Sequence, residues 1–274
     1  MRRSYWTQSL ITLLSAGLLA GQASAADTLR VGGTGGAMPM AQHISMAYAA
    51  QGGPTIEIVP DLGSSGAIRA VADGVIDLAI SSRALKAEES ARGLRDTRFA
   101  LTPLVLITSH PAPGSVKSSD LPQMFGTQTA KWPDGTPVRV ILRPKSETDN
   151  AIFILQFPGM AEAIDAARLR PELRVAQTDQ DTASTAEDLP GSLVQSGLSQ
   201  IVTEKRDVRL VAIDGVEPTL ENFESGAYPY EKRFYLVYAE KTATAAQGLL
   251  DFLQSDEGRK VLRETGSLTV GSDE

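Results

Sequence analysis

The chain has 274 residues, a formal net charge of −7 and no cysteine. Without cysteine, a disulfide scaffold, thiol chemistry and zinc–thiolate sites are excluded. The acidic balance argues against nucleic acid or an anionic membrane surface as a partner, and the 42% of apolar residues is usual for a soluble globular protein.

The first 25 residues have the three parts of a secretory signal peptide. Arg2 and Arg3 precede an apolar run over 10–20, and Ala23 to Ala25 fits a cleavage site. We therefore expect cleavage after Ala25 and a periplasmic mature protein, with an uncleaved anchor as the alternative. The mature chain would carry 24 basic and 33 acidic residues, so a local site must hold any anionic ligand against a charge of −9.

Apolar runs alternate with helical segments in the first third of the chain. Strands are expected at 29–31 and 55–59, with a helix over 39–50 between them. A second helix with apolar residues at 67, 68, 71 and 72 stops at Gly74, before a strand at 77–80. Repeated βαβ units predict an α/β fold with a mainly parallel sheet flanked by helices.

A second series of elements follows a break in the pattern. A buried strand is expected at 101–107, and the Pro- and Ser-rich stretch 110–119 is where one lobe would lead into another. Further strands at 138–142, 209–213 and 234–238, a helix over 148–157 and one closing helix through 249–262 complete the prediction. We place lobe 1 at 26–105 with 231–274, and lobe 2 at 106–230.

Catalytic patterns are weak throughout the chain. His43 and His110 fit ordinary surface histidines. A hydrolase nucleophile elbow would need glycine at position 67, where the chain has Ala67. A dinucleotide-binding loop would need glycine at position 38, where the chain has Met38. Carboxylate clusters such as Glu88 with Glu89, or Asp179 with Asp181, are expected on solvated loops or helix faces. We expect no enzyme activity, no metal and no cofactor.

The stretch DLGSSGAIRAV over 61–71 places small residues at the start of an amphipathic helix. Gly63, Ser64, Ser65 and Gly66 would leave backbone N–H groups open to an oxyanion, and the two serines add hydroxyl donors. The alternative is a cap that serves only its own helix.

A second candidate follows the strand that ends at Leu142. Arg143, Lys145 and Ser146 precede the helix that carries Asp149, so positive charge would lie at the carboxyl end of a strand. The compatible alternative is a capping box, with Ser146 as cap and Asp149 at the third helical position.

The order of these motifs resembles the periplasmic phosphate-binding proteins of ABC importers, which have the type II periplasmic-binding-protein fold. The resemblance covers nearly all of the mature chain. The matching segments are 33–39, the GSSG helix start 63–66, 77–81, 121–126 with Trp132, Arg143, 191–194, 213–219, 226–229 and 252–258.

The resemblance implies a monomeric binding protein that encloses a small oxyanion, most simply phosphate, between two lobes and presents it to an ABC permease in the inner membrane. No chemistry is done on the ligand. The ligand residues implied are Thr34, Gly63, Ser64, Ser65, Gly66, Ser82, Arg143, Ser146 and Asp149.

Departures from the family pattern fall on the ligand site. The family's Thr-Phe before the proline is Ala37-Met38, and its aspartate after the third strand is Ser82. In the family that aspartate accepts a hydrogen bond from protonated phosphate and repels sulfate, so Asp149 or Glu147 would have to supply the acceptor here. Otherwise the pocket takes another ligand. The alternative is a degenerate pocket in a sensing or adhesion protein that binds a protein partner.

Overall fold

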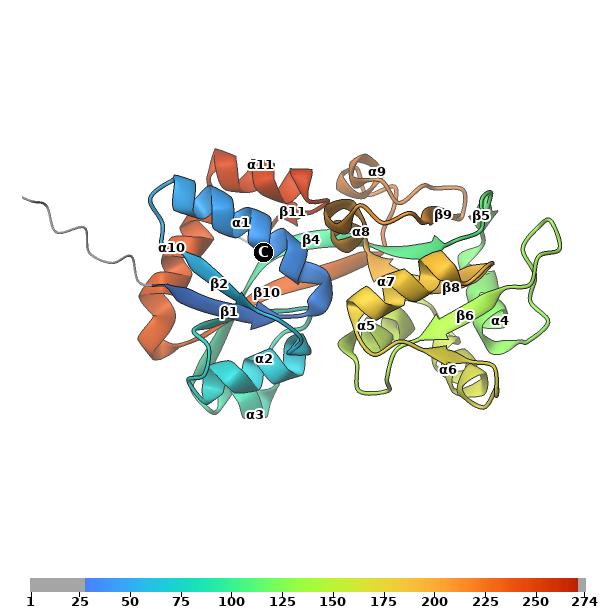
Figure 1. Cartoon of the computed structure of the whole chain (residues 1–274), viewed down its shortest axis with the longest axis horizontal. Coiled ribbons are helices and arrows are strands. Elements are labelled where there is room, and N and C mark those ends of the chain that lie inside the picture. The colour runs from blue at the N-terminus through green and yellow to red at the C-terminus, as the bar shows by residue number, and fades with distance from the viewer. Residues whose placement is uncertain (1–27, 271–274) are drawn as a thin grey trace, which may run out of the picture.

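The computed structural model describes residues 28–270, so the predicted signal peptide lies outside the described residues. Two halves lie side by side in Figure 1, one with α1 and α2 and the other with α5 and α6. The strands are β1 (Leu29–Gly33), β2 (Ile56–Val59), β3 (Leu78–Ser81), β4 (Leu94–Thr108), β5 (Ser115–Val116), β6 (Arg139–Leu142), β7 (Arg174–Val175), β8 (Ser192–Gly197), β9 (Arg209–Ile213), β10 (Glu231–Ala239) and β11 (Leu268–Thr269). The helices are η1 (Gly35–Ala37), α1 (Met38–Ala50), α2 (Gly63–Ala72), α3 (Ala87–Ser90), η2 (Ser118–Asp120), α4 (Leu121–Gly126), α5 (Thr148–Gln156), α6 (Met160–Arg168), α7 (Asp179–Asp188), α8 (Leu198–Glu204), α9 (Leu220–Glu224), η3 (Glu240–Thr242), α10 (Ala243–Gln254) and α11 (Asp256–Glu264).

One sheet path joins the two halves, in the order β2-β1-β3-β10-β4-β8-β6-β7. Pairing is parallel among β2, β1 and β3 and among β8, β6 and β7, as the βαβ pattern predicts. Strands β4 and β10 run antiparallel to their neighbours. The predicted α/β class is confirmed, with antiparallel pairing confined to the strands that link the halves and to β11.

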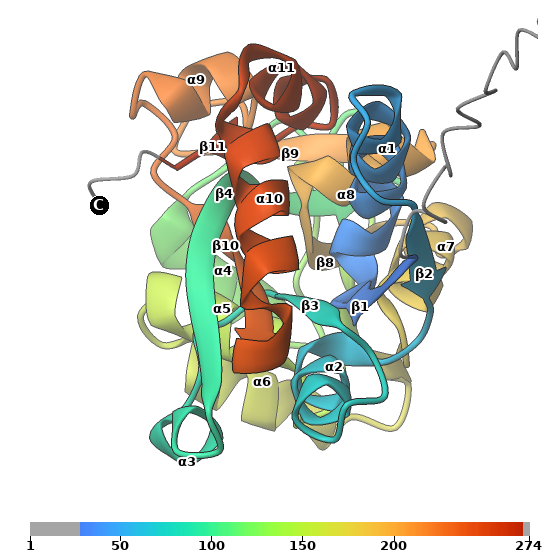
Figure 2. The ribbon, with the colours of Figure 1, turned by 90° about the vertical axis from the view of Figure 1, so that its left-hand side faces the viewer.

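The first half has an apolar core on each face of its sheet. Leu78 and Ile80 of β3 pack in the cluster formed with α1, α10 and α11, whereas Ala79 faces Ile68 and Val71 of α2. Figure 2 shows α1 above α2, with α10 running down the middle of the view. Because strand side chains alternate between faces, the continuous apolar run of β3 serves both layers.

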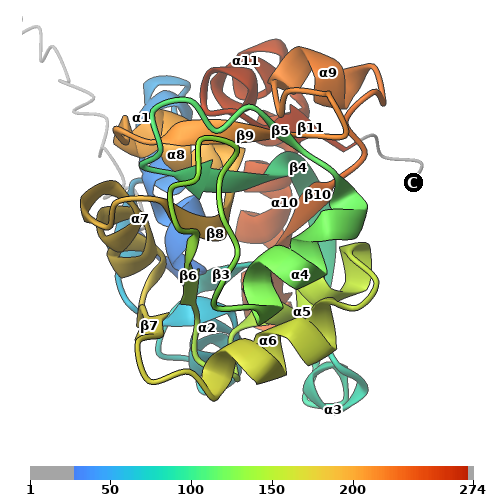
Figure 3. The same cartoon turned by 90° about the vertical axis from the view of Figure 1, so that its right-hand side faces the viewer.

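The second half repeats this arrangement. Leu193 of β8 packs with α4, α5 and α6, whereas Val194 packs with α7 and α8 on the other face. Figure 3 shows α4, α5 and α6 grouped on one side of β8 and β6, with α7 on the other. The carboxyl end of β6 leads into α5, and that of β8 leads into α8. Ligand sites of open α/β sheets form at these carboxyl ends.

Strand β4 is longer than the predicted strand at 101–107, and it belongs to both halves. Leu94 and Phe99 lie in the two cores of the first half, and Leu104 and Val105 in the two cores of the second. The lobe boundaries at 105/106 and 230/231 stay a prediction. The boundary at 230/231 falls just before β10, and the one at 105/106 falls within β4, after the apolar cores have already changed between Ala100 and Leu104.

The single closing helix of the prediction is wrong. The chain forms two helices, α10 and α11, which are separated at Ser255. The Ser255 hydroxyl accepts a hydrogen bond from the Gly258 N–H at 3.2 Å and so caps the second helix. Apolar residues at 249–253 and 261–262 therefore belong to different helices that share one core.

His43 is exposed, as predicted, but the surface position predicted for His110 is wrong. His110 is buried, stacks on Trp132 with ring centroids 5.2 Å apart, and places its Nε2 3.0 Å from Asp134 Oδ2. Hydrogen bonds from Thr136 and then His110 lower the pKa of Asp134 to about 2. The histidine thus has a structural role at the connector where a polar loop covers the core.

Candidate functional site

The loop after β1 places backbone donors between the two halves. Thr34 is buried, and its carbonyl accepts a hydrogen bond from the Ala37 N–H at 3.0 Å, which closes the short η1 turn before α1. The Gly36 N–H then points away from its own helix and donates to Asp179 Oδ2 at 3.0 Å. An acceptor from the second half therefore lies at the start of η1, where backbone N–H groups favour negative charge.

Asp179 begins α7, directly after Thr178, whose hydroxyl caps the helix. Its second oxygen, Oδ1, lies 4.0 Å from Arg143 Nη2. Burial and then the nearby Asp149 carboxylate raise the pKa of Asp179, against the opposing effects of Lys232, Arg143 and the Gly36 N–H. The prediction that Asp179 lies on a solvated loop or helix face is wrong, because the residue is only 8% exposed.

Arg143 follows β6 and is buried at the base of α5. Its Nη1 donates to the Ala176 carbonyl at 3.3 Å, and its Nη2 donates to Glu147 Oε2 at 3.2 Å. The Nε–H has no hydrogen-bond partner among the described residues. A guanidinium held in this way keeps one donor for a further acceptor.

Lys232 on β10 is the second buried cation and was not predicted. Its side chain is 2% exposed, and its Nζ lies 2.8 Å from Asp149 Oδ2. Burial alone would lower the pKa of Lys232, but the carboxylates of Asp149 and Asp179 raise it. A β-carbon on Gly197 would lie 3.5 Å from Lys232 Cδ, so the lysine packs along the end of β8.

Charges of both signs lie together in the site. Arg143 and Lys232 face the buried carboxylates of Asp149 and Asp179, and the half-buried Glu147 adds a third carboxylate. Buried charges are stable only when they are paired and hydrogen-bonded. The site therefore holds two buried cations against two buried carboxylates and one half-buried carboxylate.

The start of α2 forms a separate group of hydroxyls. Ser64 Oγ lies 3.1 Å from Ser82 Oγ and accepts the Ser82 N–H, also at 3.1 Å. Gly63 takes a positive φ of 62° where the chain turns into the helix. Ser65 is exposed, and its hydroxyl accepts from Arg83, which pairs with Glu89 through two contacts of 2.7 Å. Ser64 and Ser82 are thus brought together, while Ser65 turns outward.

The start of α5 differs from the predicted capping box. The N-cap is Glu147, no side chain caps the helix, and Ser146 is exposed. Asp149 turns to the buried ammonium of Lys232 instead, because a charge-assisted hydrogen bond in a buried site is stronger than one to an exposed backbone N–H. The capping-box interpretation of Ser146 and Asp149 is therefore wrong.

The predicted residues fall into two groups and two outliers. Thr34, Arg143 and Asp149 lie around the buried charges, together with Gly36, Asp179 and Lys232. Ser64 and Ser82 lie at the start of α2, with Gly63 and Gly66 beside them, and Ser65 and Ser146 lie at the surface. A cavity of about 350 Å³ links Ser82 to α5 and β10; its lining is Ser82, Arg83, Ile152, Leu155, Gln156, Pro229, Glu231, Arg233 and Tyr235.

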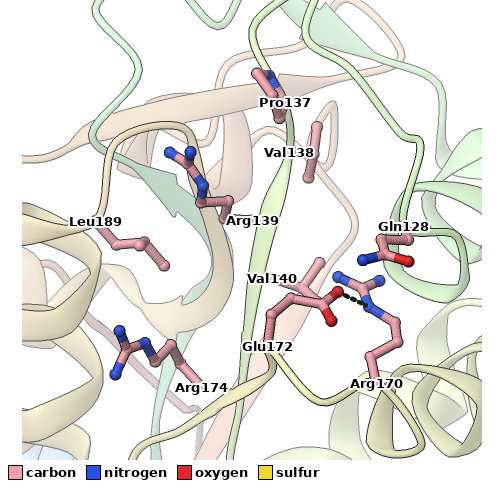
Figure 4. Close-up of a pocket in the computed structure, with 9 residues that line it drawn as sticks. All are labelled: Gln128, Pro137, Val138, Arg139, Val140, Arg170, Glu172, Arg174 and Leu189. Atoms are coloured by element: carbon pink, nitrogen blue, oxygen red, sulfur yellow. Dashed lines mark hydrogen bonds and ion pairs between the residues drawn. The ribbon is translucent and has the colours of Figure 1, made fainter.

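Another cavity, of about 320 Å³, lies in the second half and is shown in Figure 4. Its lining includes Arg139, Arg170 and Arg174 together with Val138 and Val140. Arg170 pairs with Glu172 at 2.9 Å, and Arg139 donates to the Pro190 carbonyl. It contains none of the predicted ligand residues, so the buried charges between the halves are the better candidate site.

Within residues 28–270, no cluster of three or more histidine, aspartate or glutamate side chains could hold a metal ion. No helix in the same range has the length and apolar character needed to cross a bilayer.

Comparison with known proteins shows the family of this chain. The chain is 22% identical to the phosphate-binding protein PstS of Borreliella burgdorferi, over 88% of this chain and 89% of that protein. It is also 22% identical to PstS of Bacillus subtilis, over 91% and 83%. A putative phosphate ABC transporter substrate-binding protein from Clostridium perfringens, solved with bound phosphate, shares the fold with a TM-score of 0.74, at 21% identity over 89% of this chain and 100% of that chain. A family model described as the PBP superfamily domain matches residues 20–257, and the chain therefore belongs to that family.

Proposed function

We propose that the chain is a periplasmic solute-binding protein that captures a small oxyanion, phosphate above all, between two lobes and presents it to an ABC permease. The relatives with phosphate-binding names support this proposal. The observation that carries it is local. A carboxylate, itself a small oxyanion, is held at the Gly36 N–H beside the Arg143 guanidinium, at the junction of the two halves.

Each lobe has its own part in this proposal. The first supplies the Gly36 N–H and the α2 start with Ser64, and the second supplies Arg143, whose Nε–H is unpaired in the described structure. Closure of two lobes on an anion brings such donors together and removes water from around them. Ser65 and Ser146 remain predicted ligand residues, although their side chains lie at the surface in this structure.

Selectivity for protonated oxyanions would come from a carboxylate. The family's aspartate after the third strand is Ser82, which hydrogen-bonds to Ser64. Asp149 lies in the site and can accept a hydrogen bond from the hydroxyl of hydrogen phosphate. Fully ionised sulfate has no such hydrogen, so the same carboxylate would repel it.

Thermal unfolding of the mature protein, purified free of phosphate, tests the proposal against phosphate, sulfate, molybdate and small carboxylates. A ligand at 100 times its dissociation constant adds about 2.7 kcal/mol to the free energy of unfolding, so phosphate should raise the Tm. Arg143→Ala should abolish the rise. Arg92→Ala, which breaks only an exposed pair with Asp73, should keep it. No rise with any oxyanion would contradict the proposal.

A further inference from the structure

Asp179 connects the two halves at the position proposed for the ligand. It comes from α7 in the second half, and its Oδ2 accepts the Gly36 N–H of the first half at 3.0 Å. The adjacent Gln180 adds a second contact, from its Nε2 to the Gly35 carbonyl at 3.1 Å. The start of α7 therefore covers the donor that an oxyanion would need.

The glycines of η1 allow this close approach. A β-carbon on Gly35 would lie 2.7 Å from Asp179 Oδ2, and one on Gly36 would lie 3.8 Å from Asp179 Cγ. The Asp179 carbonyl accepts a hydrogen bond from Gln200 at 2.9 Å, which fixes the start of α7 against α8. The carboxylate is thus positioned by contacts on several elements, and it is buried.

We propose that Asp179 is an internal competitor of the ligand: its carboxylate occupies the anion position formed by the Gly36 N–H and Arg143, and an incoming oxyanion takes its place. This inference rests on the proposed function, because it concerns the same site. Asp179 is then the residue that sets the affinity. Without ligand it joins the halves, and with ligand it leaves the Gly36 N–H and accepts a proton from solvent, so that it can donate a hydrogen bond to the oxyanion.

Proton uptake follows from the charges that face Asp179. Asp149 of α5 repels it, Lys232 of β10 and Arg143 after β6 attract it, and η1 presents no titratable side chain. Two further carboxylates are linked to Asp179 only indirectly. Glu147 accepts a hydrogen bond from Arg143, and Glu204 accepts hydrogen bonds from Gln180 and Gln200. Burial and Asp149 already raise the pKa of Asp179, and an oxyanion beside it raises that pKa further. Binding therefore takes up a proton, and affinity rises as pH falls.

Titration calorimetry with inorganic phosphate tests the inference on the mature protein and on Asp179→Asn. The amide still accepts the Gly36 N–H but carries no charge, so phosphate should bind the variant more tightly by roughly 5- to 150-fold, the usual range of coupling between sites. Asp188→Asn, an exposed change at the other end of α7, is the matched control and should leave affinity unchanged.

The proton inventory is measured by repeating the titrations in buffers of different ionisation enthalpy. Phosphate titrates itself, so the informative quantity is the difference between wild type and Asp179→Asn; wild type should take up more protons. Phosphate binding by the variant alone would support the role of Asp179 as a competitor and would contradict the proposed function of the wild-type chain. Equal affinity and equal proton uptake would overturn the inference and leave the proposed function standing. Absence of binding by both folded proteins, checked by circular dichroism, would overturn both.

Discussion

Lys232 and Asp149 form an ion pair that is strong because both side chains are buried away from water. Their side chains are 2% and 9% exposed, so neither charge has water as an alternative partner. Removing one member of such a pair leaves the other charge buried and unpaired, which is far more costly than removing both. The pair therefore holds α5 against β10 only while both charges are present.

Lys232→Met should lower the free energy of unfolding by about 3–5 kcal/mol, because Asp149 is left without its ammonium. The double variant Lys232→Met with Asp149→Leu should recover most of that loss. Urea denaturation measures both effects. Lys260→Met, at an exposed pair with Glu257, should change stability by less than about 1 kcal/mol. Equal losses in the single and double variants would refute this account of the pair.

Asp179 should also make stability depend on pH. Its pKa in the folded state lies above the ordinary 3.8, so the folded protein binds the proton more tightly than the unfolded chain does. Protonation of Asp179 therefore adds to the free energy of unfolding. This addition is fully present below pH 3.8 and is lost as pH rises through the pKa of the folded state. Asp179→Asn should unfold at a higher urea concentration than wild type at pH 7, and this advantage should disappear near pH 4. An advantage that grows with acid would show that the pKa is lowered instead.

At the scale of single elements, glycines separate positions of close backbone approach from positions of mere flexibility. A β-carbon on Gly33 would lie 2.1 Å from the Ile80 carbonyl oxygen, so β1 and β3 would have to move apart. A β-carbon on Gly66 would meet only Leu62 Cβ at 3.8 Å, inside the helical region of α2. Gly33 is thus required by the close approach of two strands, whereas the packing around Gly66 would admit a methyl group.

Gly33→Ala should destabilise the protein by about 3 kcal/mol, through overpacking against a backbone atom. Gly66→Ala should stabilise it by about 0.5–1 kcal/mol, because alanine loses less backbone entropy in a helix. Thermal unfolding of both variants gives the comparison. A stable Gly33→Ala protein would show that β1 and β3 can separate at little cost.

The element pattern was predictable because it depends on local periodicity, but the site depends on contacts between distant segments. Strand β1, helix α2 and strand β3 follow directly from apolar spacing and punctuation by glycine. The amino-terminal part of β4 was missed, because polar residues at 95–98 interrupt its apolar pattern. Asp179 and Lys232 were missed because nothing nearby in the sequence marks them as buried; only the meeting of η1, α7 and β10 does so.

At the scale of the whole molecule, the site for an anion lies in an acidic protein. The full chain carries a formal charge of −7, which repels a negative ligand at long range, while Arg143 and Lys232 attract it at short range. Salt screens the long-range field more than the buried contacts, since the Debye length falls from about 30 Å at 0.01 M to about 8 Å at 0.15 M. Association with phosphate should therefore become faster as sodium chloride rises over this range, as stopped-flow fluorescence would record. Slower association with salt would mean that a local positive field guides the ligand.

The two halves share β4 and β10, so a ligand between them acts on the whole fold. A crystal structure of the mature protein grown with arsenate would show directly whether an oxyanion binds there, because arsenic can be located by anomalous scattering. We expect one strong peak within hydrogen-bond distance of the Gly36 N–H and the Arg143 guanidinium, with Asp179 moved off the Gly36 N–H and donating a hydrogen bond to the arsenate. A structure in which Asp179 still accepts the Gly36 N–H, with no arsenate at Arg143, would contradict this expectation.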